Sequence, residues 1–188
     1  MVWSKLATLA ALCAVAGVGC ADRSTSGEPA GTASGTLSLY VKDAPPRTLS
    51  AARVTFSEFR VHNRTTGQMI DLLAGREATI DLVKAHDDPY GAGYVGNFSV
   101  SPGEYDGVGA LTVKTVSFTT DTNFTCTDPR FPMSAGPITG PATVLTMSPN
   151  GAASLVVDLP LAGGTCTVPG GVDGRLEFDM TRATCRAR

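Results

Sequence analysis

The sequence predicts an all-β protein with a single antiparallel β-sandwich. Short runs of apolar residues alternate with polar ones, which is the pattern of strands with one buried face. Gly, Pro and Asn-Gly turn signals separate these runs. No segment combines ten or more residues of helical periodicity with capping residues. About eight short strands joined by such turns are typical of a sandwich or a barrel.

The first two strands are expected at Thr36–Val41 and Arg53–His62. In the first, apolar and polar residues alternate strictly, and Asp43–Pro46 ends it because neither proline can donate a ladder hydrogen bond. In the second, the apolar phase shifts by one residue between Phe56 and Phe59. Such a slip predicts a β-bulge.

Six further strands are expected between residues 68 and 180. They are 68–73, 78–83, 109–120, 142–148, 153–161 and 175–180. The predicted turns between them are Thr66-Gly67, Pro102-Gly103, Asp106-Gly107, Asn150-Gly151 and Asp173-Gly174. Asn150-Gly151 lies between two apolar runs and is the strongest hairpin signal.

The N-terminus has the pattern of an export signal. Lys5 precedes the uncharged apolar run Leu6–Gly19, which as a helix would span about 21 Å, short of a hydrocarbon core of about 30 Å. Small residues lead from this run to Cys20, as in bacterial lipoprotein signals. We therefore expect residues 1–19 to be a signal peptide and Cys20 to carry the acyl chains, including palmitate. The alternative is an ordinary signal cut near Ala21, which would release a secreted protein.

Residues 20–35 are expected to form a flexible, lipid-anchored linker. Ala21–Gly35 is rich in Ser, Thr, Gly, Ala and Pro and has no large apolar residue, so it cannot form a core of its own. Stable anchoring needs more than one acyl chain, which lipoprotein processing supplies. The expected partner is thus a membrane, the expected location is the cell envelope, and Ala21 after Cys20 favours the outer membrane.

Residues 36–188 are long enough for one domain of about 150 residues. The chain has 15 basic and 17 acidic side chains, and loss of Lys5 with the signal changes the net charge from −2 to −3. No basic patch stands out, so nucleic acid is not an expected partner.

Three cysteines remain in this domain, namely Cys126, Cys166 and Cys185. Their spacing contains no CxxC or Cys/His cluster, so no metal site is predicted. One disulfide is expected in an oxidising envelope. Matching Thr-Cys-Thr settings favour Cys126 with Cys166, although three pairings are open, and closing this loop would contribute about 3–4 kcal/mol.

Four motifs occur in a familiar order: GTLSLYVKDAP at 35–45, VTFSEFRVH at 54–62, TIDLV at 79–83 and SPGEY at 101–105. This order resembles the domain of unknown function 4382, a family of exported, often lipid-anchored bacterial and archaeal proteins. The resemblance covers residues 35–116 and departs from the family pattern at Val83 and in GVGALTV. It implies a transthyretin-like or immunoglobulin-like sandwich and no activity. The half from Asp121 onward lies outside it.

The segment Lys84–Gly96 concentrates most of the reactive side chains. They are His86, Asp87, Asp88, Tyr90 and Tyr94. They could ligate a metal or transfer a proton while the rings stack a sugar, but the oxygen spacing of a calcium loop is absent. A polar loop with a turn at Asp88-Pro89 is the favoured interpretation. We therefore predict no metal and no cofactor.

Two further carboxylates, Asp71 and Asp81, follow isoleucine in repeated Ile-Asp-Leu triplets. They could form an acid/base pair, but solvent-facing or turn-forming roles are favoured. His62 is expected at a strand end, and no GxSxG or SxxK motif occurs. A non-enzymatic module that binds an envelope protein or glycan is the favoured function. The alternative is a metal-dependent or hydrolytic enzyme that uses His86, Asp87 and Asp88.

Overall fold

The core of the protein lies between two β-sheets, whose inward residues form one cluster of buried side chains. The computed structural model describes residues 33–42, 49–87, 92–120, 125–138, 144–166, 174–178 and 184–187. Thr32–Arg188 forms one compact unit. Within the described residues, no helix is long and apolar enough to cross a membrane.

The described elements are thirteen strands and one short helix. The first seven, in chain order, are β1 (Gly35–Lys42), β2 (Leu49–Asn63), β3 (Gln68–Asp71), β4 (Ala78–Asp81), α1 (Leu82–Asp87), β5 (Gly93–Val100) and β6 (Gly103–Thr120). The others are β7 (Thr125–Thr127), β8 (Met133–Ala135), β9 (Leu145–Met147), β10 (Ala152–Asp158), β11 (Leu161–Cys166), β12 (Gly174–Phe178) and β13 (Thr184–Ala187).

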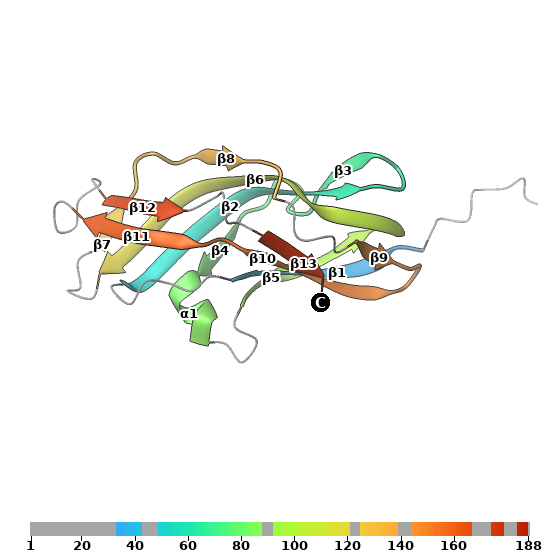
Figure 1. Cartoon of the computed structure of the whole chain (residues 1–188), viewed down its shortest axis with the longest axis horizontal. Coiled ribbons are helices and arrows are strands. Elements are labelled where there is room, and N and C mark those ends of the chain that lie inside the picture. The colour runs from blue at the N-terminus through green and yellow to red at the C-terminus, as the bar shows by residue number, and fades with distance from the viewer. Residues whose placement is uncertain are drawn as a thin grey trace, which may run out of the picture. The chain divides into compact units, whose positions relative to one another are not determined.

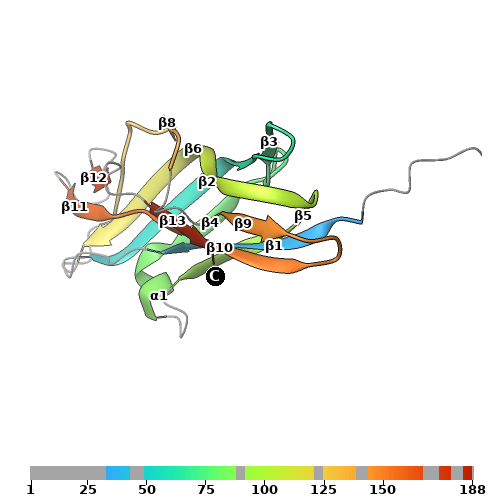
Figure 2. The ribbon, with the colours of Figure 1, turned by 45° about the vertical axis from the view of Figure 1, so that its right-hand side comes forward.

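The larger sheet is built around the long strands β2 and β6. Its order is β3-β2-β6-β7, with β4 also on β2 and with β8 and β9 also on β6. The second sheet has the order β13-β10-β1-β5, and β11 pairs with β12. The two layers are visible in Figures 1 and 2. The predicted all-β sandwich is confirmed, and within its described pairs only β1 and β10 run parallel.

The bulge predicted in the second strand is confirmed at Ser57. Phe56 pairs with Val113 on β6 and Glu58 pairs with Thr112, so Ser57 is an extra residue on β2. This insertion lets both Phe56 and Phe59 point into the core, where neither is exposed.

Of two predicted turns, the one at Thr66-Gly67 forms and the one at Asp106-Gly107 does not. Thr66-Gly67 joins β2 to β3 as predicted, with Gly67 at a φ of 69° and its N–H donating to the Asn63 carbonyl at 2.8 Å. Asp106-Gly107 is not a turn between strands. It lies inside β6, where Gly107, at a φ of 132°, forms a bulge opposite His62.

The predicted hairpin at Asn150-Gly151 is wrong, although a tight turn does form there. Asn150 has a φ of 56°, and the Gly151 N–H donates to the Ser148 carbonyl at 2.9 Å. However, β9 pairs with β6 and β10 pairs with β1, so the turn leads from one sheet to the other. Turn chemistry specifies the chain reversal but not which strand each arm meets.

The corner between β5 and β6 is closed by Tyr105. Its hydroxyl donates to the Ser101 carbonyl at 2.6 Å, and its side chain is buried. Burial raises the pKa of Tyr105, and the nearby Asn63 side chain only partly opposes this. A buried tyrosine bonded to the backbone a few residues upstream is also how immunoglobulin-type sandwiches fix a corner.

A disulfide joins Cys126 on β7 to Cys166 on β11, with Cα atoms 5.9 Å apart. This is the pair that the sequence favours. It connects the two-stranded sheet to the larger sheet. Cys185 lies in β13, and its side chain is outside the described set.

Candidate functional site

The segment that the sequence selected, 84–96, begins in a helix rather than a loop. α1 covers residues 82–87, so His86 and Asp87 occupy its last positions, and their side chains are outside the described set. Asp88 and Tyr90 lie outside the described residues. Tyr94 is therefore the one candidate of this segment whose surroundings the structure describes.

Tyr94 forms an aromatic pair with Tyr40 on the outer face of the sheet β13-β10-β1-β5. The two residues are in register on β5 and β1, and their ring centroids lie 5.4 Å apart with planes tilted by 52°. A bulge at Val95 shifts the register just before this pair. Tyr94 is 52% exposed, so about half of its surface is available to a partner.

A shallow open pocket of about 280 Å³ adjoins Tyr94 where β4, α1 and β5 meet. Its lining residues are Thr79, Ile80, Asp81, Lys84, Ala85, Gly93 and Tyr94. The close approach of β5 depends on Gly93, because a β-carbon there would lie 2.5 Å from Ile80 Cγ2 and 3.1 Å from Ala85 Cβ. The packing therefore brings Lys84 and Tyr94 to one pocket, which Asp81 also lines.

Asp71 and Asp81 serve the backbone and do not form an acid/base pair. One oxygen of each carboxylate accepts an N–H from β2 and another from the residue two positions ahead. For Asp71 the donors are Phe59 and Leu73, and for Asp81 they are Ala52 and Val83, all at 3.1–3.2 Å. The two residues pair with Arg60 and Arg53, seven positions apart on β2. That separation is roughly 23 Å, far beyond the roughly 5–10 Å of carboxylates that act together.

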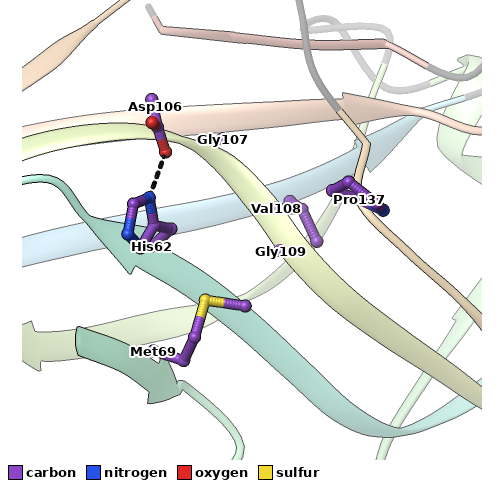
Figure 3. Close-up of a pocket in the computed structure, with 7 residues that line it drawn as sticks. All are labelled: His62, Met69, Asp106, Gly107, Val108, Gly109 and Pro137. Carbon is purple, nitrogen blue, oxygen red and sulfur yellow. Dashed lines mark hydrogen bonds and ion pairs between the residues drawn. The ribbon is translucent and has the colours of Figure 1, made fainter. Parts of the chain in front are cut away.

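A second pocket, of about 350 Å³, lies beside the hairpin of β2 and β3 (Figure 3). Its lining residues are His62, Met69, Asp106, Gly107, Val108, Gly109 and Pro137. Most of this lining is apolar, and His62 and Asp106 are its two ionisable side chains. Such a lining is typical of small ligand sites.

His62 and Asp106 form a hydrogen-bonded pair at this pocket. His62 Nδ1 lies 2.9 Å from Asp106 Oδ1, and Arg64 Nε lies 3.8 Å from Asp106 Oδ2. The bulge at Gly107 sets Asp106 opposite His62. Sequence reasoning placed His62 at a strand end and missed this pair. The signal was the Asp106-Gly107 dipeptide inside a strand pattern, where it indicates a bulge as readily as a turn.

Met69 lies next to His62 at the same pocket. The two residues are directly opposite in the β2–β3 register, and Met69 is 44% exposed. A β-carbon on Gly109 would lie 2.6 Å from the Met69 sulfur and 3.9 Å from His62 Cβ. The thioether therefore lies over Gly109. Any residue with a β-carbon at position 109 would fill this space.

Among the residues that the structure describes, no three His, Cys, Asp or Glu side chains gather as a metal site. A match to the family model "Domain of unknown function (DUF4382)" covers residues 34–179. It extends well past the range 35–116 that the motifs suggested, so the second half is part of the same family domain. No curated protein and no solved structure matches the chain. Because the match spans most of the sequence, the chain belongs to the DUF4382 family.

Proposed function

We propose that this protein is an exported, lipid-anchored component of the cell envelope whose β-sandwich acts as a non-enzymatic binding module. The short apolar run before Cys20 and the Ser/Gly-rich residues 21–35 support the anchor and its tether. The compact unit begins at Thr32, so the tether would reach almost to the first strand. In this proposal Cys20 supplies attachment, and the sandwich supplies recognition.

The observation that carries the binding role is the exposed Tyr94 ring beside the pocket that contains Lys84. Exposed aromatic rings stack on sugars and anchor protein interfaces because they bury much apolar area with little loss of conformational freedom. Lys84, which lines the same pocket, would add attraction for an acidic group, while the Asp81 carboxylate there already accepts two backbone N–H groups. The expected ligand is therefore an envelope glycan with acidic groups or an acidic surface of an envelope protein.

The anchor is tested by the intact mass of the protein from its host's membranes. We expect a chain that begins at Cys20 and carries acyl chains, and a Cys20→Ser variant should lack them. A mass that begins at Ala21 without lipid would contradict the anchor and leave a secreted sandwich.

The binding role is tested with Tyr94→Ala and Lys84→Ala in retention on immobilised envelope glycan and protein fractions. Loss of an aromatic anchor should weaken retention about 10-fold, equivalent to about 1.4 kcal/mol. Met133→Ala removes a side chain that is 44% exposed on β8, and it serves as the control. If both pocket variants are retained like the parent, this pocket is not the contact surface.

A further inference from the structure

The imidazole of His62 is arranged as that of a metal-binding histidine. Donation of its Nδ1–H to Asp106 at 2.9 Å would leave the lone pair on Nε2. No described residue forms a hydrogen bond with Nε2. Histidines that bind metals nearly always donate their other ring N–H to a carboxylate or carbonyl, which orients the ring and makes the free nitrogen more basic.

A second donor, the thioether of Met69, is adjacent to this ring. Residues directly opposite on paired antiparallel strands project to the same face, with β-carbons about 5 Å apart. The space above Gly109 is filled by the Met69 methyl carbon with the sulfur next to it, and His62 Cβ borders the same space. Figure 3 shows both side chains at one pocket, with Asp106 on the far side of the imidazole from Met69.

We propose that His62 Nε2 and Met69 Sδ bind a soft monovalent metal ion, Cu(I). Thioether sulfur is a soft donor that selects Cu(I), and imidazole suits copper as well. Cu(I) has a filled d shell and accepts two donors in line, so a histidine and a methionine suffice. Binding forms two coordinate bonds and changes no oxidation state, and the ion arrives already reduced.

The surroundings of the two donors favour this ion over harder ones. Zn²⁺ sites take three or four Cys, His or carboxylate ligands, and among the described residues no three such side chains gather. Val108 and Pro137 add apolar surface beside the two donors, so the pocket offers no further hard oxygen ligand from these side chains. Met69 has three rotatable side-chain bonds, so its sulfur can turn towards Nε2 without movement of the backbone.

The first experiment observes the donors directly. The protein, labelled with ¹³C at its methionine methyl groups and with ¹⁵N, is treated with N-ethylmaleimide to block competing free thiols. It is then titrated with Ag(I), a redox-inert ion that has a filled d shell like Cu(I). We expect the Met69 methyl signal and the His62 ring nitrogen signals to shift together and to saturate at one ion per chain. A shift of Met133, equally exposed at 44%, that matches that of Met69 would overturn the proposal.

The second experiment measures the Cu(I) affinity of the N-ethylmaleimide-treated protein by competition with a coloured Cu(I) chelator. Met69→Leu keeps the side-chain volume but removes the sulfur, and His62→Gln replaces the imidazole with an amide whose nitrogen has no lone pair to offer, so each should abolish competition. Asp106→Asn should weaken binding by about 10-fold because it disturbs the group that orients the ring. Met133→Leu is the matched control and should bind like the parent.

Gly109→Ala tests the geometry separately from the donors. It keeps His62 and Met69, but its β-carbon would overlap the Met69 methyl group and press on the sulfur, so the thioether must move and Cu(I) affinity should fall. The methionine spectrum of each variant shows whether it remains folded. If folded Met69→Leu and His62→Gln variants compete for Cu(I) as the parent does, the site does not exist.

Discussion

At the scale of single residues, the Ile-Asp-Leu triplets are a repeated structural unit. β3 and β4 are both four residues long and pair with the same strand, β2. Where each ends, the aspartate carboxylate accepts the next N–H of β2 in place of a strand carbonyl. The leucine that follows, Leu72 or Leu82, is buried in the core. The triplet thus ends a strand and returns the chain to the core.

We expect Asp71→Ala and Asp81→Ala to destabilise the protein by about 1.5–3 kcal/mol each, because each carboxylate accepts two backbone N–H groups. Urea unfolding measures the loss. Asp71→Asn keeps an oxygen acceptor and should lose less. Glu77→Ala breaks an exposed ion pair with Lys114 and should cost less than about 1 kcal/mol. Equal losses for Asp71→Ala and Glu77→Ala would contradict this role.

At the scale of elements, the corner between β5 and β6 packs against the hairpin of β2 and β3. The Glu104 N–H donates to Thr65 Oγ1 at 3.0 Å, and the Arg64 N–H donates to the Glu104 carbonyl at 2.7 Å. Gly103 makes this approach possible. Its φ is 144°, and a β-carbon would lie 2.9 Å from Asn63 Oδ1 and 3.0 Å from Thr65 Oγ1.

Gly103→Ala should therefore destabilise the protein by about 3 kcal/mol, since it combines backbone strain with a clash against buried Asn63. Gly67→Ala is the matched control. Gly67 has a φ of 69° but nothing within 4 Å of its β-carbon position, so this variant should show only strain of about 1–2 kcal/mol. Thermal unfolding compares the two, and equal losses would show that the corner can relax around a methyl group.

At the scale of the whole molecule, the disulfide is a covalent cross-link between the larger sheet and the pair β11–β12. It joins cysteines 40 residues apart. We expect the Cys126→Ala/Cys166→Ala double variant to lose about 4 kcal/mol of stability by the loop-closure argument. Urea unfolding with and without a reductant checks this. Reduction should lower the parent to the level of the double variant and leave that variant unchanged, and a parent insensitive to reduction would contradict the prediction.

At the candidate site, the sequence indicated single residues but not the contacts between residues far apart in the chain. The Lys84–Gly96 segment stands out by its composition, and in the structure Lys84, Ala85, Gly93 and Tyr94 of this segment line a pocket together with the end of β4. The pairing of Tyr94 with Tyr40 was not predictable, because the two residues lie far apart in sequence and meet through strand register. The same holds for His62, Asp106 and Met69, which come together from β2, β6 and β3.

The sequence by itself determined the features that depend on neighbouring residues: the strand periodicity, the bulge between Phe56 and Phe59, and the turn at Thr66-Gly67. It also indicated the cysteine pair that the structure joins. Only the tertiary structure decided that β1 pairs parallel with β10 and that Asn150-Gly151 passes between sheets. The reason is physical. Local rules specify how a segment bends and which face it buries, whereas strand partners follow from how all the apolar faces are buried together in one core.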